Sequence, residues 1–313
     1  MTSVLRIGVD LGGTKIEAIA VDGDAAVRSR RRVPTPRHDY AATLEAIAGL
    51  VAQVEAEVGG RGSVGIGIPG AISPATGLAK NANSVWLNGQ PLHRDLERRL
   101  DRPVRLANDA NCFALSEATD GAGAGARVVF GAIVGTGTGG GIVAGGRVFT
   151  GANGIAGEWG NNPLPWPDAS ETPGPECYCG RRGCIELFLS GPGLSRDHRE
   201  RTGEDLAAEA IAARAAAGDG PCEDALRRYE GRMARGLATV INVVDPDVII
   251  LGGGMSSLAR LYTRVPERWA EYVFSDRVDT RLVPPRHGPA SGARGAAWLW
   301  SVGEAEALRF GWA

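Results

Sequence analysis

A glycine-rich turn near the start of the chain carries residues that could hold phosphate. Alternating apolar residues predict a strand from Ile7 to Leu11, and a second strand is expected from Ile16 to Val21. Gly12-Gly13-Thr14 lies between them, so this segment is predicted to be a hairpin with a glycine tip. Such a tip exposes backbone N–H groups that an anion can approach closely.

The polar residues of this hairpin add the chemistry that phosphate transfer needs. Thr14 supplies a hydroxyl, Lys15 a cation, and Asp10 a carboxylate able to reach a hydrated Mg²⁺. The turn differs from the usual P-loop, because a strand rather than a helix follows it. An ordinary hairpin turn with a polar tip is the alternative interpretation.

A second hairpin of the same design is expected in the middle of the chain. Val128 to Val134 predicts a strand, G-T-G-T-G-G-G runs from Gly135 to Gly141, and Ile142 to Ala144 resumes as a strand. Two such tips, one in each lobe, could grip a polyphosphate chain from opposite sides. A third glycine turn, Gly252 to Met255, follows the apolar strand Val248 to Leu251. It would suit an adenine–ribose unit, although a plain strand–helix turn explains it equally well.

Asp109 is the candidate general base of the sequence. Val104 to Asn108 predicts a strand that delivers Asn108 and Asp109 at its carboxyl end, before a helix that begins near Ala110. Ligands gather at the carboxyl ends of strands in open α/β sheets, which favours a catalytic carboxylate there. The alternative is that Asp109 simply caps the helix that follows.

Three clustered cysteines predict a metal site. Cys177, Cys179 and Cys184 are soft ligands within one turn-rich segment, and Gly180 and Gly183 allow the chain to wrap an ion. This chemistry suits tetrahedral Zn²⁺, whereas three reduced core cysteines would be unusual in so polar a stretch. Five cysteines in all fit a reducing cytosol better than a disulfide framework.

Apolar periodicity predicts the elements that position these residues. Spacings of three and four predict helices from Leu44 to Val58 and from Leu226 to Val244, ended by Gly59-Gly60 and by Asp245-Pro246. We also expect strands at Ala25 to Val33 and Ser63 to Pro69, and a helix at Leu92 to Leu100.

A chain of 313 residues suits two lobes with a cleft between them. Gly121 to Gly125 (G-A-G-A-G) is the clearest candidate boundary. We expect a small α/β lobe over 1–117, to which a C-terminal helix within 299–313 returns. The large α/β lobe would span 118–298 and contain a zinc-binding segment at 161–186.

The charge pattern argues against nucleic-acid and membrane partners. The net charge is −2, and no stretch approaches the length of a transmembrane helix. Arg6 and Asp10 interrupt any apolar region of a signal peptide, so a cytoplasmic protein is expected.

The motifs together resemble those of the bacterial ROK sugar kinases, within the hexokinase–actin–Hsp70 superfamily. The resemblance covers essentially the whole chain and rests on D-L-G-G-T-K (Asp10 to Lys15), L-A-N-D-A-N-C (Leu106 to Cys112), G-T-G-T-G-G-G, A-G-E-W-G (Ala156 to Gly160), C-Y-C-G-R-R-G-C-I-E (Cys177 to Glu186) and L-G-G-G-M (Leu251 to Met255). K-N-A-N-S-V-W-L-N-G (Lys80 to Gly89) and N-P-L-P-W (Asn162 to Trp166) look most like the fructokinase and mannokinase branch.

The resemblance implies an α/β, two-lobed, actin-like ATPase fold and transfer of the γ-phosphoryl of ATP to a hexose, usually at its 6-hydroxyl. Asp109 would accept the hydroxyl proton, and Asp10 would help to place Mg²⁺. ATP would be bound by Asp10, Gly12, Gly13, Thr14, Lys15, Gly135, Thr136, Gly137, Thr138, Gly252 and Gly253. The sugar would be bound by Gly70, Asn108, Asp109, Glu158, Asn161 and Glu186.

One residue departs from the family pattern. The family places a zinc-binding histidine directly after G-E-x-G, where this chain has Asn161. The fourth zinc position could therefore be water, another residue or empty, and nothing in the sequence brings His198 there. Because that histidine also faces the sugar in the family, Asn161 marks either a weakened copy or an enzyme retuned to an unusual sugar. An amino-hexose such as 3-amino-3-deoxyglucose (kanosamine) is one such sugar, since Glu158 could balance its ammonium group.

Three alternatives to an ATP-dependent kinase remain at this stage. A ROK-type regulator would carry a DNA-binding domain before the first phosphate motif, and only nine residues precede Asp10. A non-catalytic sugar sensor would have lost Asp10 or Asp109, and both are present. A polyphosphate donor would need a basic track that the sequence does not reveal. The family is often dimeric, so a homodimer is expected.

Overall fold

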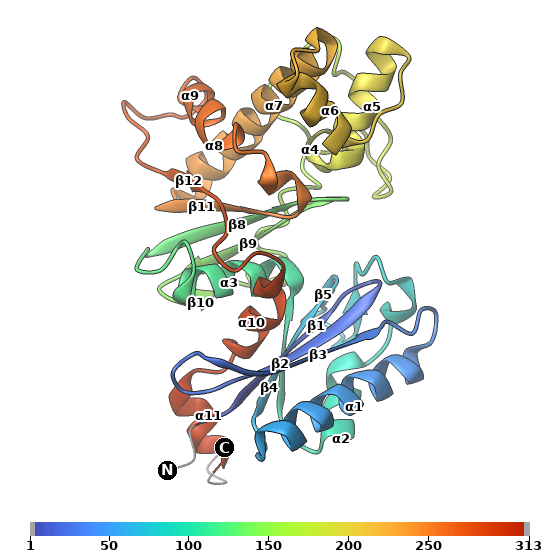
Figure 1. Cartoon of the computed structure of the whole chain (residues 1–313), viewed down its shortest axis with the longest axis vertical. Helices are drawn as coiled ribbons and strands as arrows, with labels where there is room; N and C mark the ends of the chain where they lie inside the picture. The colour runs from blue at the N-terminus through green and yellow to red at the C-terminus, as the bar shows by residue number, and fades with distance from the viewer. Residues whose placement is uncertain (1–3, 310–313) are drawn as a thin grey trace. The chain divides into compact units, whose positions relative to one another are not determined.

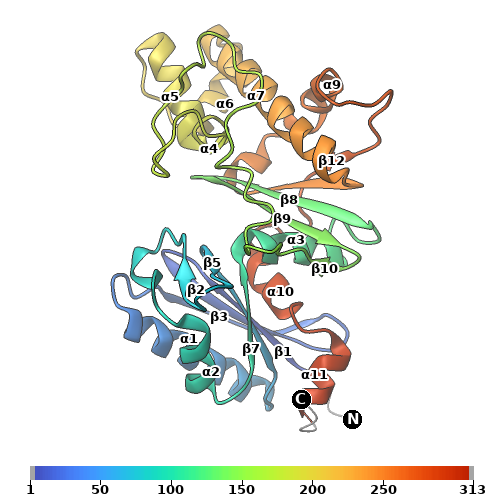
Figure 2. The same cartoon turned by 180° about the vertical axis from the view of Figure 1, so that it is seen from behind.

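Two five-stranded sheets organise the chain, which the computed structural model describes from residue 4 to residue 309 (Figure 1, Figure 2). The described residues form two compact units. Unit 1 comprises 4–121, 141–156 and 289–309, and unit 2 comprises 122–140 and 157–288. These units depart from the predicted lobes at 118–121, 141–156 and 289–298, all of which belong to unit 1.

The first sheet lies in unit 1 and has the order β3-β2-β1-β4-β7. β1 pairs antiparallel with β2 and parallel with β4, and β4 pairs parallel with β7. The pairing of Leu11 with Ile16 closes the predicted hairpin. The strands are β1 (Arg6–Leu11), β2 (Lys15–Val21), β3 (Val27–Pro34), β4 (Ser63–Ile68) and β7 (Val104–Asn108).

The two helices that the sequence predicts in this part of the chain pack on one face of this sheet. α1 (Tyr40–Val58) contacts β2 and β3, and α2 (Leu92–Leu100) packs beside α1 (Figure 1). Asp39 begins α1 by accepting a hydrogen bond from the backbone N–H of Ala42, and Gly59 ends it with φ of 69°. A left-handed φ of this kind favours glycine, which confirms the predicted stop signal.

The opposite face of the first sheet carries α3 (Asp109–Asp120) and α10 (Ser291–Ala297). A Cβ on Gly8 would lie 1.8 Å from the carbonyl oxygen of Ala293, and one on Gly65 would lie 1.9 Å from that of Ala296. These glycines allow α10 to touch the sheet backbone. Apolar periodicity does not predict α10, because its residues are mostly small and show no apolar period.

The C-terminal helix predicted within 299–313 is present as α11 (Val302–Arg309), which contacts β4. The part of that prediction that covers 310–313 lies outside the described residues. Shorter elements of unit 1 are β5 (Ala71–Ile72), β6 (Ala79–Lys80), η1 (Val85–Leu87) and most of η3 (Gly288–Ala290).

The second sheet has the order β10-β9-β8-β11-β12. β11 pairs parallel with β8 and with β12, so the carboxyl ends of β8 and β11 lie next to each other. β9 begins at Thr138, so the prediction of a loop through Gly141 is wrong and the tip is shorter. A Cβ on Gly140 would lie 2.7 Å from Phe130 of the neighbouring strand β8, so this glycine serves close packing between the two strands. The strands are β8 (Val128–Val134), β9 (Thr138–Ala144), β10 (Arg147–Val148), β11 (Val248–Gly252) and β12 (Arg281–Val283).

The helices of unit 2 centre on the long helix α7 (Gly220–Val244), which confirms the helix predicted from its apolar period. Its end at Asp245 has φ of 45°. The other helices of unit 2 are α4 (Glu186–Leu189), α5 (Gly191–Thr202), α6 (Ala208–Ala216), η2 (Gly254–Ser257), α8 (Leu261–Arg264) and α9 (Pro266–Trp269). Within residues 4–309, no helix combines the length and the apolar character that crossing a membrane requires.

A buried ion-pair network joins the long segment that precedes α4 to the helix α7. Glu171 receives hydrogen bonds from Arg232 at 2.7 Å and from Arg235 at 2.9 Å, and all three side chains are buried. Burial by itself would raise the pKa of Glu171, but the two guanidinium groups outweigh it and lower that pKa. These ion pairs therefore hold the chain in place a few residues before the cysteines.

Candidate active site and cysteine cluster

Two carboxylates meet at the carboxyl ends of the parallel strands in unit 1. Asp10 lies near the end of β1, and Asp109 follows β7 as the first residue of α3. Burial, with Asp109 and Glu17 adding negative charge, raises the pKa of Asp10 to about 6. A Cβ on Gly292 would lie 2.8 Å from Asp10 Oδ2, so the carboxylate rests against the start of α10.

Asn108, and not Asp109, is the residue that caps the helix after β7. Asn108 is the N-cap of α3, because its Oδ1 accepts a hydrogen bond from the backbone N–H of Ala110 at 2.8 Å. Its Nδ2 donates to the carbonyl oxygen of Gly70 at 3.0 Å, which ties β7 to the turn after β4. Asp109 therefore is not the cap, although its Oδ1 also accepts from Ala110. Its side chain stays accessible to solvent, while the surrounding protein atoms raise its pKa.

The glycine tip of the first hairpin is held from outside by residues that the sequence analysis did not single out. Thr35 donates from Oγ1 to the carbonyl oxygen of Gly12 at 2.6 Å, and Arg37 donates from Nε to that of Gly13 at 3.1 Å. The backbone N–H of Gly12 donates a hydrogen bond to the carbonyl oxygen of Lys15 at 3.0 Å, which closes the tip. Thr14 lies in the same tip, so the predicted phosphate-binding residues of unit 1 are adjacent in space.

The glycine turns of unit 2 lie at the carboxyl ends of β8 and β11. Gly253 has φ of 79°, and a Cβ there would lie 2.4 Å from the carbonyl oxygen of Val134. The backbone N–H of Gly191, at the start of α5, donates to the carbonyl oxygen of Gly135 at 2.8 Å. These contacts bring two predicted nucleotide-binding turns against a helix that the sequence did not connect with them.

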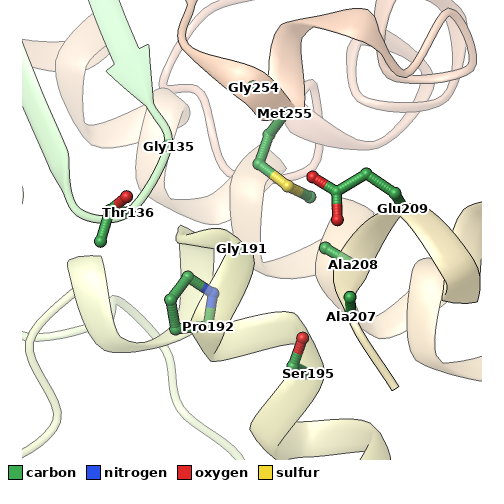
Figure 3. Close-up of a pocket in the computed structure, with 10 residues that line it drawn as sticks. All are labelled: Gly135, Thr136, Gly191, Pro192, Ser195, Ala207, Ala208, Glu209, Gly254 and Met255. Carbon is green, nitrogen blue, oxygen red and sulfur yellow. The ribbon is translucent and has the colours of Figure 1, made fainter.

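A pocket of about 360 Å³ opens between these turns and helices α5 and α6. Figure 3 shows Thr136 and Pro192 on one side of it and Ala208, Met255 and Glu209 on the other. Predicted residues Gly135 and Thr136 line it, whereas Gly252 and Gly253 do not and only precede the lining residues Gly254 and Met255 in the chain. Sequence reasoning missed the helical lining, because no local motif marks Gly191, Pro192, Ser195, Ala207, Ala208 and Glu209.

Asn161 and Glu186 lie beside the cysteines in unit 2. Asn161 Nδ2 donates to Glu186 Oε1 at 2.9 Å, and Cys177 Sγ donates to the same oxygen at 3.2 Å. A Cβ on Gly137 would lie 3.4 Å from Glu186 Oε2, so this carboxylate also borders the second glycine tip, near Thr138. Glu158 belongs to the same segment, three residues before Asn161.

The three cysteines are close enough to share one metal ion. The Sγ atoms of Cys177, Cys179 and Cys184 all lie within 4.8 Å of one another, and those of Cys179 and Cys184 are 3.6 Å apart. Sulfurs bound to one Zn²⁺ at ~2.3 Å lie roughly 3.8 Å apart, so these residues fit a thiophilic ion. Burial raises the pKa of Cys177 to about 12, whereas the backbone N–H of Arg181 lowers that of the exposed Cys179.

His198 is not part of this cluster. Its side chain is buried, with Nδ1 3.1 Å from the carbonyl oxygen of Glu204 and Nε2 3.6 Å from Cys222 Sγ. These partners fix the ring between α5 and α7.

The sheets, the glycine turns and the acidic pair match a known class, and the chain belongs to the ROK family, whose pattern covers residues 6–302. The chain is 41% identical over 296 residues to the N-acetyl-D-glucosamine kinase of Salmonella paratyphi C, covering 93% of this chain and 98% of that protein. The ROK hexokinase of Thermus thermophilus is 34% identical with a TM-score of 0.84, covering 95% of this chain and 97% of that one. A ROK glucokinase of Streptomyces griseus, solved with glucose and AMPPNP, is 30% identical with a TM-score of 0.74, covering 94% and 98%.

These comparisons confirm the predicted actin-like ATPase fold class and the predicted enzyme class, an ATP-dependent sugar phosphotransferase. The curated relatives are N-acetyl-D-glucosamine kinases, whereas the sequence motifs had pointed to the fructokinase and mannokinase branch. The sugar is therefore the open question about the reaction.

Proposed function

We propose that this chain transfers the γ-phosphate of ATP to the 6-hydroxyl of a hexose derivative, with N-acetyl-D-glucosamine as the first candidate. Support for the sugar comes from the relatives, which are 41% identical over 93% of this chain and act, by their names, on N-acetyl-D-glucosamine. Support for the reaction comes from Asp109, a solvent-accessible carboxylate at the carboxyl end of β7.

Asp109 is the proposed general base. Its position after a parallel strand suits contact with a substrate hydroxyl, and its raised pKa brings it closer to the range in which a carboxylate accepts a proton effectively. Asn108 holds the strand end in place through Gly70 and Ala110. In this proposal Asn108 and Gly70 border the sugar together with Asp109.

Asp10 is the residue that would hold Mg²⁺. Its carboxylate is a hard oxygen ligand. Burial, together with repulsion by Asp109, raises its pKa, and a divalent cation would relieve both effects. Bound Mg²⁺ would neutralise charge on the ATP phosphates. The turn formed by Gly12, Gly13, Thr14 and Lys15 would contact those phosphates from unit 1.

The pocket of unit 2 is the proposed site for the nucleoside part of ATP. It starts at Gly135 and Thr136, in a tip with exposed backbone, and continues to the apolar groups of Ala207, Ala208 and Met255 (Figure 3). The lining thus changes from backbone groups at one end of the pocket to apolar side chains at the other. This order matches that of the phosphates and the base in ATP. Gly137, Thr138, Gly252 and Gly253 would shape the phosphate end.

Glu158, Asn161 and Glu186 are the proposed sugar contacts of unit 2. A carboxylate accepts hydrogen bonds from hydroxyl, amide or ammonium groups, so these residues suit either an acetamido-hexose or a free amino-hexose. A free amino-hexose, kanosamine among them, is the second candidate, favoured by the replacement of the family's histidine by Asn161 next to Glu186.

A coupled ATP assay over fructose, mannose, glucose, N-acetylated hexosamines and free amino-hexoses tests the proposal. We expect the highest kcat/KM for N-acetyl-D-glucosamine and product phosphorylated at the 6-hydroxyl by NMR. A higher value for a free amino-hexose would favour the second candidate. Sugar binding without turnover of any sugar would favour the non-catalytic sensor instead.

The phosphate donor is tested in the same assay by replacing ATP with inorganic polyphosphate. We expect turnover with ATP and none with polyphosphate, because the proposed donor site includes a pocket for a nucleoside. Equal rates with both donors would contradict that assignment.

A further inference from the structure

Asn161 stands beside the cysteine cluster (Cys177, Cys179 and Cys184) but directs its side chain to Glu186. Its Nδ2 lies 2.9 Å from Glu186 Oε1 and 3.8 Å from Cys177 Sγ. A carboxylate only accepts hydrogen bonds, so the group that faces Glu186 must be the NH₂ of the amide. That group donates hydrogen bonds and is not a metal ligand, so Asn161 in this orientation does not complete a coordination sphere.

The backbone around Asn161 keeps it in this place. The N–H of Glu186 donates to the carbonyl oxygen of Gly160 at 2.9 Å, and the N–H of Ile185 donates to that of Asn162 at 2.9 Å. Cys184 Sγ donates to the carbonyl oxygen of Asn161 at 3.6 Å. Hydrogen bonds on both sides of Asn161 therefore fix it against the residues that follow the cluster.

Glu186 does not supply a fourth ligand either. Among residues 4–309, the group of mutually close ligand atoms at this place contains the three cysteines and no histidine, aspartate or glutamate. Glu186 Oε1 accepts from Asn161 Nδ2 at 2.9 Å, a bond that does not depend on the protonation of the cysteines, and Oε2 lies toward Gly137. His198 is held by Glu204 and Cys222.

We propose that the cysteine cluster binds a thiophilic divalent ion through three protein ligands only, which leaves the fourth position open to a small exogenous ligand. In the same arrangement Asn161, besides its proposed contact with the sugar, is a positioning residue whose amide holds the carboxylate of Glu186. A zinc site with four protein ligands is closed, whereas three protein ligands leave a position for water or another small molecule. The assignment of the metal ligands is independent of which sugar the enzyme phosphorylates.

Cobalt substitution tests the open position, because the visible spectrum of Co²⁺ responds to each change in its ligands. The full-length protein is loaded with Co²⁺ and titrated with imidazole. We expect one metal ion per chain and a saturable spectral shift as imidazole takes the open position. An unchanged spectrum at high imidazole, or a protein that binds no Co²⁺ or Zn²⁺, would overturn the proposal.

Asn161→His supplies the matched comparison. A histidine there would offer a fourth nitrogen ligand, so we expect its Co²⁺ spectrum to resemble that of the imidazole-saturated parent and to be insensitive to added imidazole. Chelator competition should show Zn²⁺ bound more tightly than in the parent, because four protein ligands would then hold the ion. Cys222→Ala, which removes a cysteine outside the cluster, should keep the parent spectrum and its imidazole response. If the histidine variant also shifts with imidazole, the fourth position is not at residue 161 and the proposal fails.

Asn161→Ala tests the positioning role separately. This variant should keep the Co²⁺ spectrum and the imidazole response while the KM for the sugar rises several-fold and kcat changes less. This arm rests on the proposed function, because it requires a sugar substrate. A KM equal to that of the parent would contradict the positioning of Glu186 by Asn161. The metal assignment would be unaffected, because the Co²⁺ spectra test it separately.

Discussion

At the scale of single residues, Asp109 and Asp10 are alike in type but differ in surroundings. Asp109 is accessible to solvent at the start of α3, with Asn108 taking over the capping hydrogen bond. Asp10 is half-buried against Gly292 and has the raised pKa of about 6. The environment of Asp109 suits the proposed acceptance of a proton, and that of Asp10 suits the proposed binding of a cation.

Asp109→Asn is expected to lower kcat by about 10²–10⁴, because the amide cannot accept the hydroxyl proton. The KM for ATP should stay within a few-fold of the parent. Steady-state kinetics with the best sugar of the screen is the measurement. Asp101→Asn is the control, since residue 101 is an exposed αL position at the end of α2 that asparagine also tolerates. Activity of the Asp109 variant close to that of this control would remove Asp109 from the role of base.

Asp10→Asn is expected to stabilise the fold above pH 6 while it abolishes activity. The pKa of Asp10 is about 6 in the folded chain and 3.8 ordinarily, so the folded state binds the proton more tightly. Stability from this group is therefore lost as the pH rises from about 4 to about 6. Asparagine cannot ionise, which should restore up to roughly 3 kcal/mol at about pH 7.5 and little at about pH 4.

Urea unfolding of the parent and of Asp10→Asn at these two pH values measures the difference. Asp101→Asn should show no such dependence on pH. A stability difference that shrinks as the pH rises would contradict the raised pKa.

At the scale of elements, buried contacts that are distant in sequence decide how segments are held. Glu171 fixes the segment before α4 to Arg232 and Arg235 of α7, more than 60 residues later in the chain. Gly295 of α10 lies so close to α3 that a Cβ would lie 1.6 Å from the carbonyl oxygen of Cys112.

Glu171→Gln is expected to destabilise the protein by about 3–5 kcal/mol, because two guanidinium groups would remain buried without their carboxylate. Glu176→Gln is the matched control, since its ion pair with Arg182 is exposed and should contribute less than about 1 kcal/mol. Denaturant unfolding compares the two variants. Equal, small effects would show that the buried network does not hold the segment.

Gly295→Ala is expected to destabilise unit 1 by about 1–3 kcal/mol or to prevent folding, because α10 would have to move away from α3. Gly49→Ala is the control within α1, where an added Cβ meets nothing within 4 Å. The control should be neutral or stabilising by up to about 1 kcal/mol, since alanine favours helix. Thermal unfolding of both variants distinguishes close packing from a general cost of replacing helical glycine.

At the scale of the whole molecule, the proposed site residues are divided between the two units. Unit 1 carries Asp10, Asn108 and Asp109, whereas unit 2 carries the pocket proposed for the nucleoside, the proposed sugar contacts and the cysteine cluster. The proposed nucleoside pocket can therefore be changed by substitutions that leave the acidic pair itself unaltered.

Ala207→Trp is expected to raise the KM for ATP at least several-fold, because the indole would fill a pocket of about 360 Å³. The KM for the sugar should change little. Ala217→Trp, also exposed but beyond the end of α6, should leave both constants near the parent values. An unchanged KM for ATP in Ala207→Trp would show that the nucleoside binds elsewhere.

The sequence by itself determined the features that depend on neighbours along the chain. The first hairpin, the helix α1 with its Gly59 stop and the helix α7 follow from apolar periods and turn residues over short stretches. The close approach of Cys177, Cys179 and Cys184 follows likewise from their short spacing, with glycines between them.

Only the tertiary structure decided the features that depend on contacts between distant segments. α10 has no apolar period, and its place comes from Gly8, Gly65 and Gly295, which let backbones touch. The choice of Asn108 over Asp109 as the N-cap is a matter of hydrogen-bond geometry. The bond from Asn161 to Glu186 joins residues 25 apart, and no local pattern encodes it, because side-chain direction there is set by the backbone pairing around both residues.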